Sequence, residues 1–128
     1  MPITFRIDPA LRLLESTFAG KVSVAEMRSY MVAVFADPGF ASDLRALTHL
    51  QDLQTEASSS ELVQYNAWRS EQPRLGKSAI VALTPHEYGI ARMFELATDG
   101  SNGAETRVFR TVEEARAWLG LTTPPVQD

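Results

Sequence analysis

The sequence predicts an α/β fold in which helices cover a mostly parallel, mixed β-sheet. Three observations lead to this prediction. Strand and helix patterns follow one another in the order β-β-α-β-α-β-α-β-α, residues 78–83 are apolar on both faces, and each expected helix opens with a Ser/Thr-x-x-Glu capping box. Alternation of strands with helices is typical of parallel sheets, and their inner strands are buried on both sides. We therefore expect one α/β domain.

The first two strands are expected to form a hairpin. Residues 3–7 alternate apolar with polar side chains, the period of a strand with one buried face. Asp8-Pro9-Ala10 has turn chemistry, because proline fixes φ and aspartate caps its own turn. A second strand is expected over residues 11–18, stopping at Gly20. So short a link favours antiparallel pairing.

The first helix begins with the capping box formed by Ser23 and Glu26. Apolar residues then follow at helical spacing, which predicts one buried stripe: Val24, Met27, Met31, Val34 and Phe35. Asp37-Pro38-Gly39 is expected to end this helix, because proline disfavours helical geometry in the residue before it.

Residues 43–53 are expected to form the third strand, with a short helix as the alternative. Leucine recurs at every third position from Leu44 to Leu53, which fits neither period cleanly. The strand is favoured because a second capping box, Ser58 with Glu61, follows shortly afterwards. The second helix then carries its apolar residues at Leu62, Val63, Tyr65 and Trp68.

The fourth strand, residues 78–83, is the best candidate for a central strand. Thr84 and Glu87 form the third capping box, and Pro85 occupies the first helical position, where its missing N–H costs nothing. We expect Gly100 to end this third helix. Its expected buried face consists of Ile90, Ala91, Met93, Phe94 and Ala97.

The last unit is a strand over residues 106–110 and a helix opened by the fourth capping box, Thr111 with Glu114. Gly120 is expected to follow this helix as its C-cap signal. The expected buried stripe is Val112, Ala115, Trp118 and Leu119. Residues 122–128 have little to pack, so we expect a domain over residues 1–121 and a flexible C-terminal tail over 122–128.

Composition excludes several classes of protein. The 128 residues carry a net charge of −4 and no cysteine, so disulfides are excluded. Ten Arg and two Lys are scattered rather than clustered, which argues against a nucleic-acid partner. No apolar run approaches the roughly 20 residues of a membrane span, and the start lacks the apolar core of a signal peptide. We expect a cytoplasmic protein.

Two stretches carry a resemblance to a known family. Residues 88–95, Tyr-Gly-Ile-Ala-Arg-Met-Phe-Glu, and residues 108–120, Val-Phe-Arg-Thr-Val-Glu-Glu-Ala-Arg-Ala-Trp-Leu-Gly, resemble the bacterial SpoIIAA-like family. The element order is that of the STAS domains to which the anti-sigma factor antagonist SpoIIAA belongs. The opening hairpin also looks like the start of that family, so the resemblance covers most of residues 1–121.

The resemblance implies two modes of action. STAS proteins that switch partners carry a phosphorylatable serine after the third strand, in a pattern like Asp-Ser-x-Gly. The matching residues 52–60 hold Ser58, Ser59 and Ser60 but lack the Asp-Ser pair and the glycine, so phosphorylation there stays an alternative. The family is also similar in architecture to the lipid-binding CRAL-TRIO domains. That similarity implies a small hydrophobic ligand or a membrane surface as partner.

Polar residues are expected to gather where the strands end and the helices begin. Three segments converge there in an open α/β sheet: Gly20-Lys21, residues 52–60 and residues 84–86. Helix N-termini in such places bind anions. Ser58 and Thr84 are already explained as N-caps, each stabilising by about 1 kcal/mol. Ser59, Ser60 and His86 remain as candidate ligand-binding residues, and Thr84 is a further candidate beside its capping role.

Aromatic residues of the second and third helices give a second candidate site. Tyr65, Trp68 and Phe94 are either core residues, the main expectation, or the border of an apolar pocket. His86 would be the base of an uncharacterised enzyme, the weakest hypothesis, because no catalytic constellation accompanies it. His49 and His86 do not have metal-ligand spacing.

The first hypothesis is therefore a non-enzymatic binding or regulatory module without metal or cofactor. It would act through a hydrophobic ligand, a membrane surface or a protein partner. Whether the chain forms a homodimer is left open by the sequence.

Overall fold

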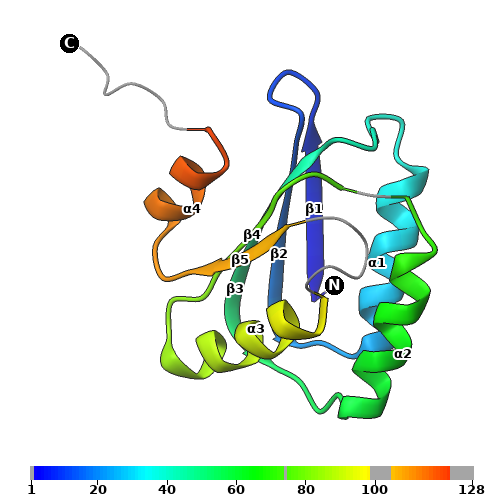
Figure 1. Cartoon of the computed structure of the whole chain (residues 1–128), viewed down its shortest axis with the longest axis vertical. Coiled ribbons are helices and arrows are strands. Elements are labelled where there is room, and N and C mark those ends of the chain that lie inside the picture. Colours follow the sequence, from blue (N-terminus) through cyan, green and yellow to red (C-terminus); the bar gives the residue numbers. More distant parts are fainter. Residues whose placement is uncertain (1, 74, 99–104, 122–128) are drawn as a thin grey trace.

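The computed structural model describes residues 2–73, 75–98 and 105–121, and its elements follow the expected order (Figure 1). Each expected strand and helix is present within these ranges. The elements are β1 (Ile3–Asp8), β2 (Leu13–Lys21), α1 (Val24–Ala36), β3 (Arg45–Gln54), α2 (Ser59–Ser70), β4 (Ser78–Val81), α3 (Pro85–Thr98), β5 (Thr106–Phe109) and α4 (Val112–Trp118).

The strands form one five-stranded sheet in the order β1-β2-β3-β4-β5. The β1–β2 hairpin is antiparallel, and the pairs β2–β3, β3–β4 and β4–β5 are parallel. The predicted fold class, a mostly parallel mixed sheet, is therefore confirmed. The middle strand is β3, and β4 lies between β3 and β5, so β4 is an interior strand but not the centre.

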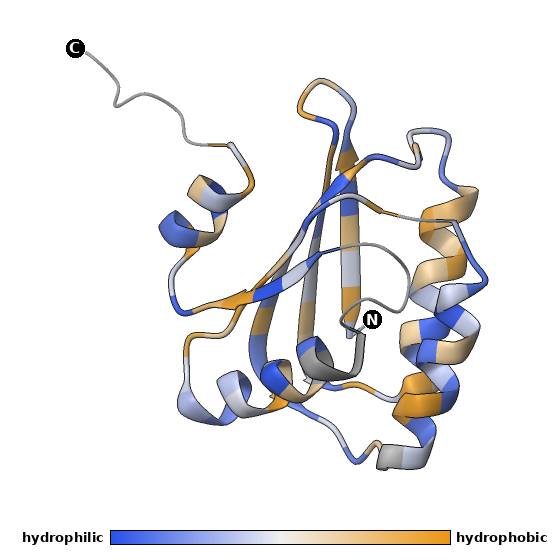
Figure 2. Cartoon of the chain, viewed as in Figure 1, coloured by the Kyte–Doolittle hydropathy of each residue, from blue (hydrophilic) through white to orange (hydrophobic). Residues whose placement is uncertain are grey.

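Helices cover both faces of the sheet. α1, α2 and α3 lie on one face, and α4 lies on the other (Figure 1). The three-helix side has a core in which Met31, Tyr65 and Ala91 pack with Leu50 of the sheet. On the other face α4 packs on β4 and β5, where Ala115 contacts the buried cluster around Leu47. Figure 2 shows hydrophobic and hydrophilic bands alternating along the strands, as a sheet with two distinct faces requires.

Two of the four expected capping boxes are complete. Ser23 and Ser58 each accept from the backbone N–H three residues on, and Glu26 and Glu61 each accept from the cap N–H. Both partners in each box therefore satisfy N–H groups that the helix itself leaves free.

For the other two boxes the prediction is wrong in the second hydrogen bond, in which the glutamate carboxylate would accept from the cap N–H. Thr84 Oγ1 accepts from the N–H of Glu87, but the Glu87 carboxylate accepts instead from the N–H of Leu53, 3.2 Å away. Thr111 Oγ1 accepts from the N–H of Glu114 and donates to the Glu114 carboxylate at 3.0 Å. In both cases the hydroxyl caps the helix while the carboxylate takes another donor.

The ends of β2 differ from the prediction. β2 begins at Leu13, because Leu11 belongs to the turn, in which Asp8 accepts from the N–H groups of Ala10 and Leu11. β2 also runs through Gly20 to Lys21 instead of stopping there. Gly20 has a φ of 71°, a left-handed conformation that glycine adopts without a side-chain clash.

A β-bulge explains the leucine spacing in β3. Leu50 pairs with Phe18 of β2, whereas Gln54 pairs with Lys21, so β3 holds one extra residue in this interval. Asp52, with a φ of 51°, lies within it. In a regular strand Leu50 and Leu53 would face opposite sides, but here both enter the same core cluster. The predicted strand is confirmed, and the alternative short helix is wrong.

Three apolar residues of the expected strands and helices are exposed. Val63 is 66% exposed, Leu83 65% and Met93 53%. Leu83 lies beyond the end of β4 at Val81, and Val63 lies away from the face of α2 that carries Tyr65. Gly100, expected to end the third helix, lies outside the described residues, as do residues 122–128.

Candidate functional site

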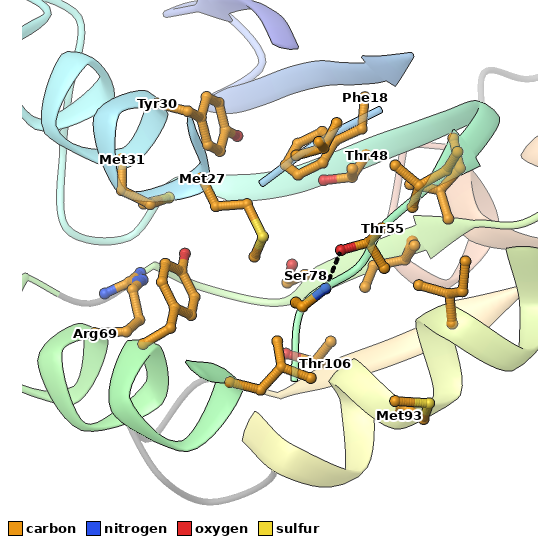
Figure 3. Close-up of a pocket in the computed structure, with 18 of the residues that line it drawn as sticks. Phe18, Met27, Tyr30, Met31, Thr48, Thr55, Arg69, Ser78, Met93 and Thr106 are labelled. Atoms are coloured by element: carbon orange, nitrogen blue, oxygen red, sulfur yellow. Dashed lines mark hydrogen bonds between the residues drawn. The ribbon is translucent and has the colours of Figure 1, made fainter. Parts of the chain in front are cut away.

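A cavity of about 170 Å³ lies between the sheet and the helices α1, α2 and α3 (Figure 3). Its surroundings are mostly apolar, with side chains from the sheet as its floor and from the helices as its walls. The floor is made by Phe18, Ala46, Thr48, Leu50, Ser78, Ile80 and Thr106. The helical walls include Met27, Tyr30, Met31, Leu62, Tyr65, Arg69, Ile90 and Met93.

The cavity exists because short side chains meet across three strands. Ala46 of β3 pairs with Ser78 of β4, and Ser78 pairs with Thr106 of β5. Thr48 lies on the same face of β3 as Ala46. Protein interiors are normally packed to the density of organic crystals. A row of such small residues beneath three helices leaves space that the helices do not fill.

Methionine side chains border the cavity on two sides. Met93 lines the cavity and is also 53% exposed, so it lies at the rim. Met27 and Met31 of α1 are buried in the opposite wall. Methionine side chains are flexible and polarisable, which lets a wall adapt to different apolar shapes.

Polar groups gather in one part of this apolar cavity. Figure 3 shows Arg69 and Tyr30 on the side of the cavity away from Met93. Tyr65 interacts electrostatically with both Tyr30 and Arg69. The Tyr30 hydroxyl shares a hydrogen bond with Ser16, a buried residue of β2.

Arg69 is an arginine with little access to solvent. Only 6% of it is exposed. Its Nη1 donates to the carbonyl oxygen of Pro73 at 2.8 Å, and its guanidinium lies 5.4 Å from the centre of the Phe35 ring. Within residues 2–73, 75–98 and 105–121, no carboxylate forms a salt bridge with it.

Burial shifts the pKa values of Arg69, Tyr65 and Tyr30. Desolvation lowers the pKa of Arg69 because water no longer stabilises its charge. Desolvation also raises the pKa of Tyr65 to about 12, and it raises the pKa of Tyr30 well above the usual tyrosine range. Both phenols are therefore neutral hydrogen-bonding groups at neutral pH.

A second, polar hollow lies at the carboxyl ends of the strands. The structure brings together Lys21, Asp52, Thr84 and His86, from the three segments that were expected to converge there. His86 is exposed, and the buried Glu87 is engaged with the backbone of β3. Side chains of both charge signs line the hollow, with Lys21 beside Asp52 and Glu56 among them.

The predicted ligand-binding residues are divided between these places. Tyr65 lines the apolar cavity, and Thr84 and His86 line the polar hollow. Trp68 packs against the core, and its ring carries the guanidinium of Arg28 at 4.9 Å. The side chain of Phe94 lies outside what the structure describes.

The three serines do not form a cluster with those residues. Ser58 is the N-cap of α2, and Ser60 is exposed in its first turn. The side chain of Ser59 lies outside what the structure describes. Phosphorylation at these serines stays a prediction.

Arg69 is the site residue that the sequence analysis missed. The signal was present, because Leu62, Tyr65 and Arg69 are spaced by three and four residues and so share one face of α2. A charged residue on the buried face of a helix is rare without a partner. An arginine on the apolar face of α2 was therefore the sequence signal for this site residue.

The described part of the chain lacks a metal-binding cluster and a membrane-spanning helix. It holds no group of three or more His, Asp or Glu side chains arranged to bind a metal ion. His49 contacts Glu15 at 2.8 Å on the face of the sheet opposite to the cavity. The two histidines line different hollows. None of the helices in the described residues is long and apolar enough to cross a membrane.

Comparison with known proteins identifies one family. The model of the family described as SpoIIAA-like matches residues 13–120. This range runs from the start of β2 to the glycine after α4 and includes every element that lines the cavity. No curated protein and no solved structure matches the chain.

Proposed function

The chain belongs to the SpoIIAA-like family, and on that premise we propose that it is a non-enzymatic binding module that takes up a small hydrophobic ligand. The observation that carries the proposal is the cavity between the sheet and α1, α2 and α3. Ligand sites in proteins are typically concave and apolar, with a few polar groups that fix orientation. The cavity has both features.

The size of the cavity sets the size of the ligand. Its volume of about 170 Å³ is similar to that of an engineered cavity of roughly 150 Å³ in another protein, which binds benzene. The enclosed part therefore holds a group of about six to eight carbon atoms. Beyond it, a longer chain would leave the cavity past Met93.

Filling the cavity from its floor tests this function. Thr48→Leu adds apolar volume at the middle of the floor, whereas Thr17→Leu makes the same change on the opposite face of the sheet, where Thr17 lies beside His49. We expect Thr48→Leu to weaken binding of 1-octanol, measured by isothermal titration calorimetry, at least tenfold. We expect Thr17→Leu to leave it unchanged.

Both variants are checked by circular dichroism and thermal unfolding, so that a loss of binding is not confused with a loss of fold. Native mass spectrometry of protein purified from cells adds an independent readout, in which we expect a retained small molecule. A wild-type protein that carries no small molecule and binds neither 1-octanol nor lipid vesicles would exclude the function.

Partner switching by phosphorylation is the alternative function. The exposed Ser60 in the first turn of α2 is the residue that favours it. Ser58 is less suited, because its hydroxyl already accepts from the N–H of Glu61 at 3.1 Å. Incubation with STAS-directed kinases, followed by mass spectrometry, would detect the phosphate, and the absence of modification at Ser58, Ser59 and Ser60 would exclude the switch.

A further inference from the structure

Arg69 places a buried positive charge beside the apolar cavity, and no carboxylate of the described residues forms a salt bridge with it. In the described residues its contacts are the carbonyl oxygen of Pro73 and the ring of Phe35. Neither carries a formal charge. A buried charge is normally paired, because its transfer out of water costs several kcal/mol. The free protein therefore holds a group that a negatively charged ligand would complement.

The surroundings of Arg69 suit the head of such a ligand. Tyr65 and Tyr30 lie close enough to Arg69 to interact with it electrostatically, and all three line the cavity. Phenol and guanidinium groups donate hydrogen bonds, and the planar guanidinium fork matches the two oxygens of a carboxylate. The remaining surroundings are apolar and suit a hydrocarbon group.

We propose that the ligand is a small apolar carboxylic acid whose carboxylate pairs with Arg69 and whose hydrocarbon group fills the cavity above Thr48. This proposal rests on the function proposed above and specifies the chemical class of its ligand. By the volume of the cavity, acids of about six to eight carbons fit within it, and longer chains emerge at Met93. No bond forms or breaks, since the protein only binds and orients the acid.

The charge of Arg69 determines whether the site prefers an acid or a neutral amphiphile. Octanoate and 1-octanol have the same hydrocarbon length and differ in charge, so the ratio of their affinities isolates the contribution of Arg69. Charge-assisted hydrogen bonds stabilise more than neutral ones. We expect the wild-type protein to bind octanoate at least tenfold more tightly than 1-octanol, measured by isothermal titration calorimetry.

Arg69→Met tests the assignment, since methionine keeps the unbranched apolar stem without the charge. We expect this variant to lose the preference for octanoate over 1-octanol. Arg69→Lys keeps the charge but not the fork, so we expect a reduced preference. Arg28→Met is the matched control, because Arg28 is an exposed arginine of α1 that packs on Trp68. It is expected to keep the full preference.

The outcomes of these experiments distinguish the carboxylate assignment from the proposed function on which it rests. Equal affinity of the wild type for octanoate and 1-octanol would overturn the carboxylate assignment but leave the hydrophobic site in place. A preserved preference in Arg69→Met would overturn it as well. Binding of neither compound would remove the proposed function itself. Should Arg69→Met fail to fold, the wild-type ratio and Arg69→Lys still decide the question.

Discussion

Replacing Glu87 by alanine is expected to destabilise the protein more than removing any exposed capping glutamate. Glu87 is the third residue of α3 and only 3% exposed. Its carboxylate accepts from the backbone N–H of Leu53 at 3.2 Å, at the end of β3. One side chain therefore joins the start of a helix to the bulged end of the central strand.

The magnitude follows from what the substitution leaves behind. Without the carboxylate, the N–H of the buried Leu53 loses its acceptor, which costs about 1–3 kcal/mol. The helix also loses a negative charge in its first turn, worth about 0.3–1 kcal/mol. We expect Glu87→Ala to lower the free energy of unfolding by about 2–3 kcal/mol.

Glu61 offers the matched control. It occupies the same third position in α2, accepts from the N–H of Ser58 at 3.0 Å and is exposed to water. Because water replaces the lost acceptor there, Glu61→Ala is expected to cost less than about 1 kcal/mol. Glu87→Gln keeps an oxygen acceptor and should fall between the two. Urea unfolding measures all three, and equal losses in Glu87→Ala and Glu61→Ala would refute the reasoning.

Two further outcomes follow from the structure. Gly120→Ala should cost about 1 kcal/mol in urea unfolding, because Gly120 has a φ of 77° and a side chain there is strained; an unchanged stability would show that this backbone is not constrained. Stability should also fall as the pH rises from 10 towards 12, since burial raises the pKa of Tyr65 from 10.0 to about 12 and the folded state therefore resists its ionisation. Tyr65→Phe should reduce this loss, and a wild-type stability independent of pH over that range would contradict the assignment.

The fold could be predicted from the sequence because its signals are local. The alternation of Ile3, Phe5 and Ile7, the cap residues Ser23 and Ser58 and the apolar run of β4 each specify one element without reference to the others. The bulge in β3 could not be predicted in this way. It depends on the register between β2 and β3, and the leucine spacing alone could not distinguish a bulged strand from a short helix.

The candidate site was predicted only in part. The convergence of Lys21, Asp52 and Thr84 followed from the rule that parallel strands end at one edge of the sheet. Tyr65, expected mainly as a core residue or else at the border of an apolar pocket, packs in the core cluster and lines the cavity. The role of Arg69 was not recognised, since a single arginine in a mixed-charge helix normally points to solvent.

The sequence by itself determined the order of the elements, their helix caps and the faces that each would bury, because these depend on neighbours a few residues away. Only the tertiary structure decided where the cavity lies. Ala46, Ser78 and Thr106 are far apart in the chain and become neighbours through strand register. The same packing buries Arg69 beside the space that they leave. Register and packing are properties of the whole sheet, and no local pattern encodes them.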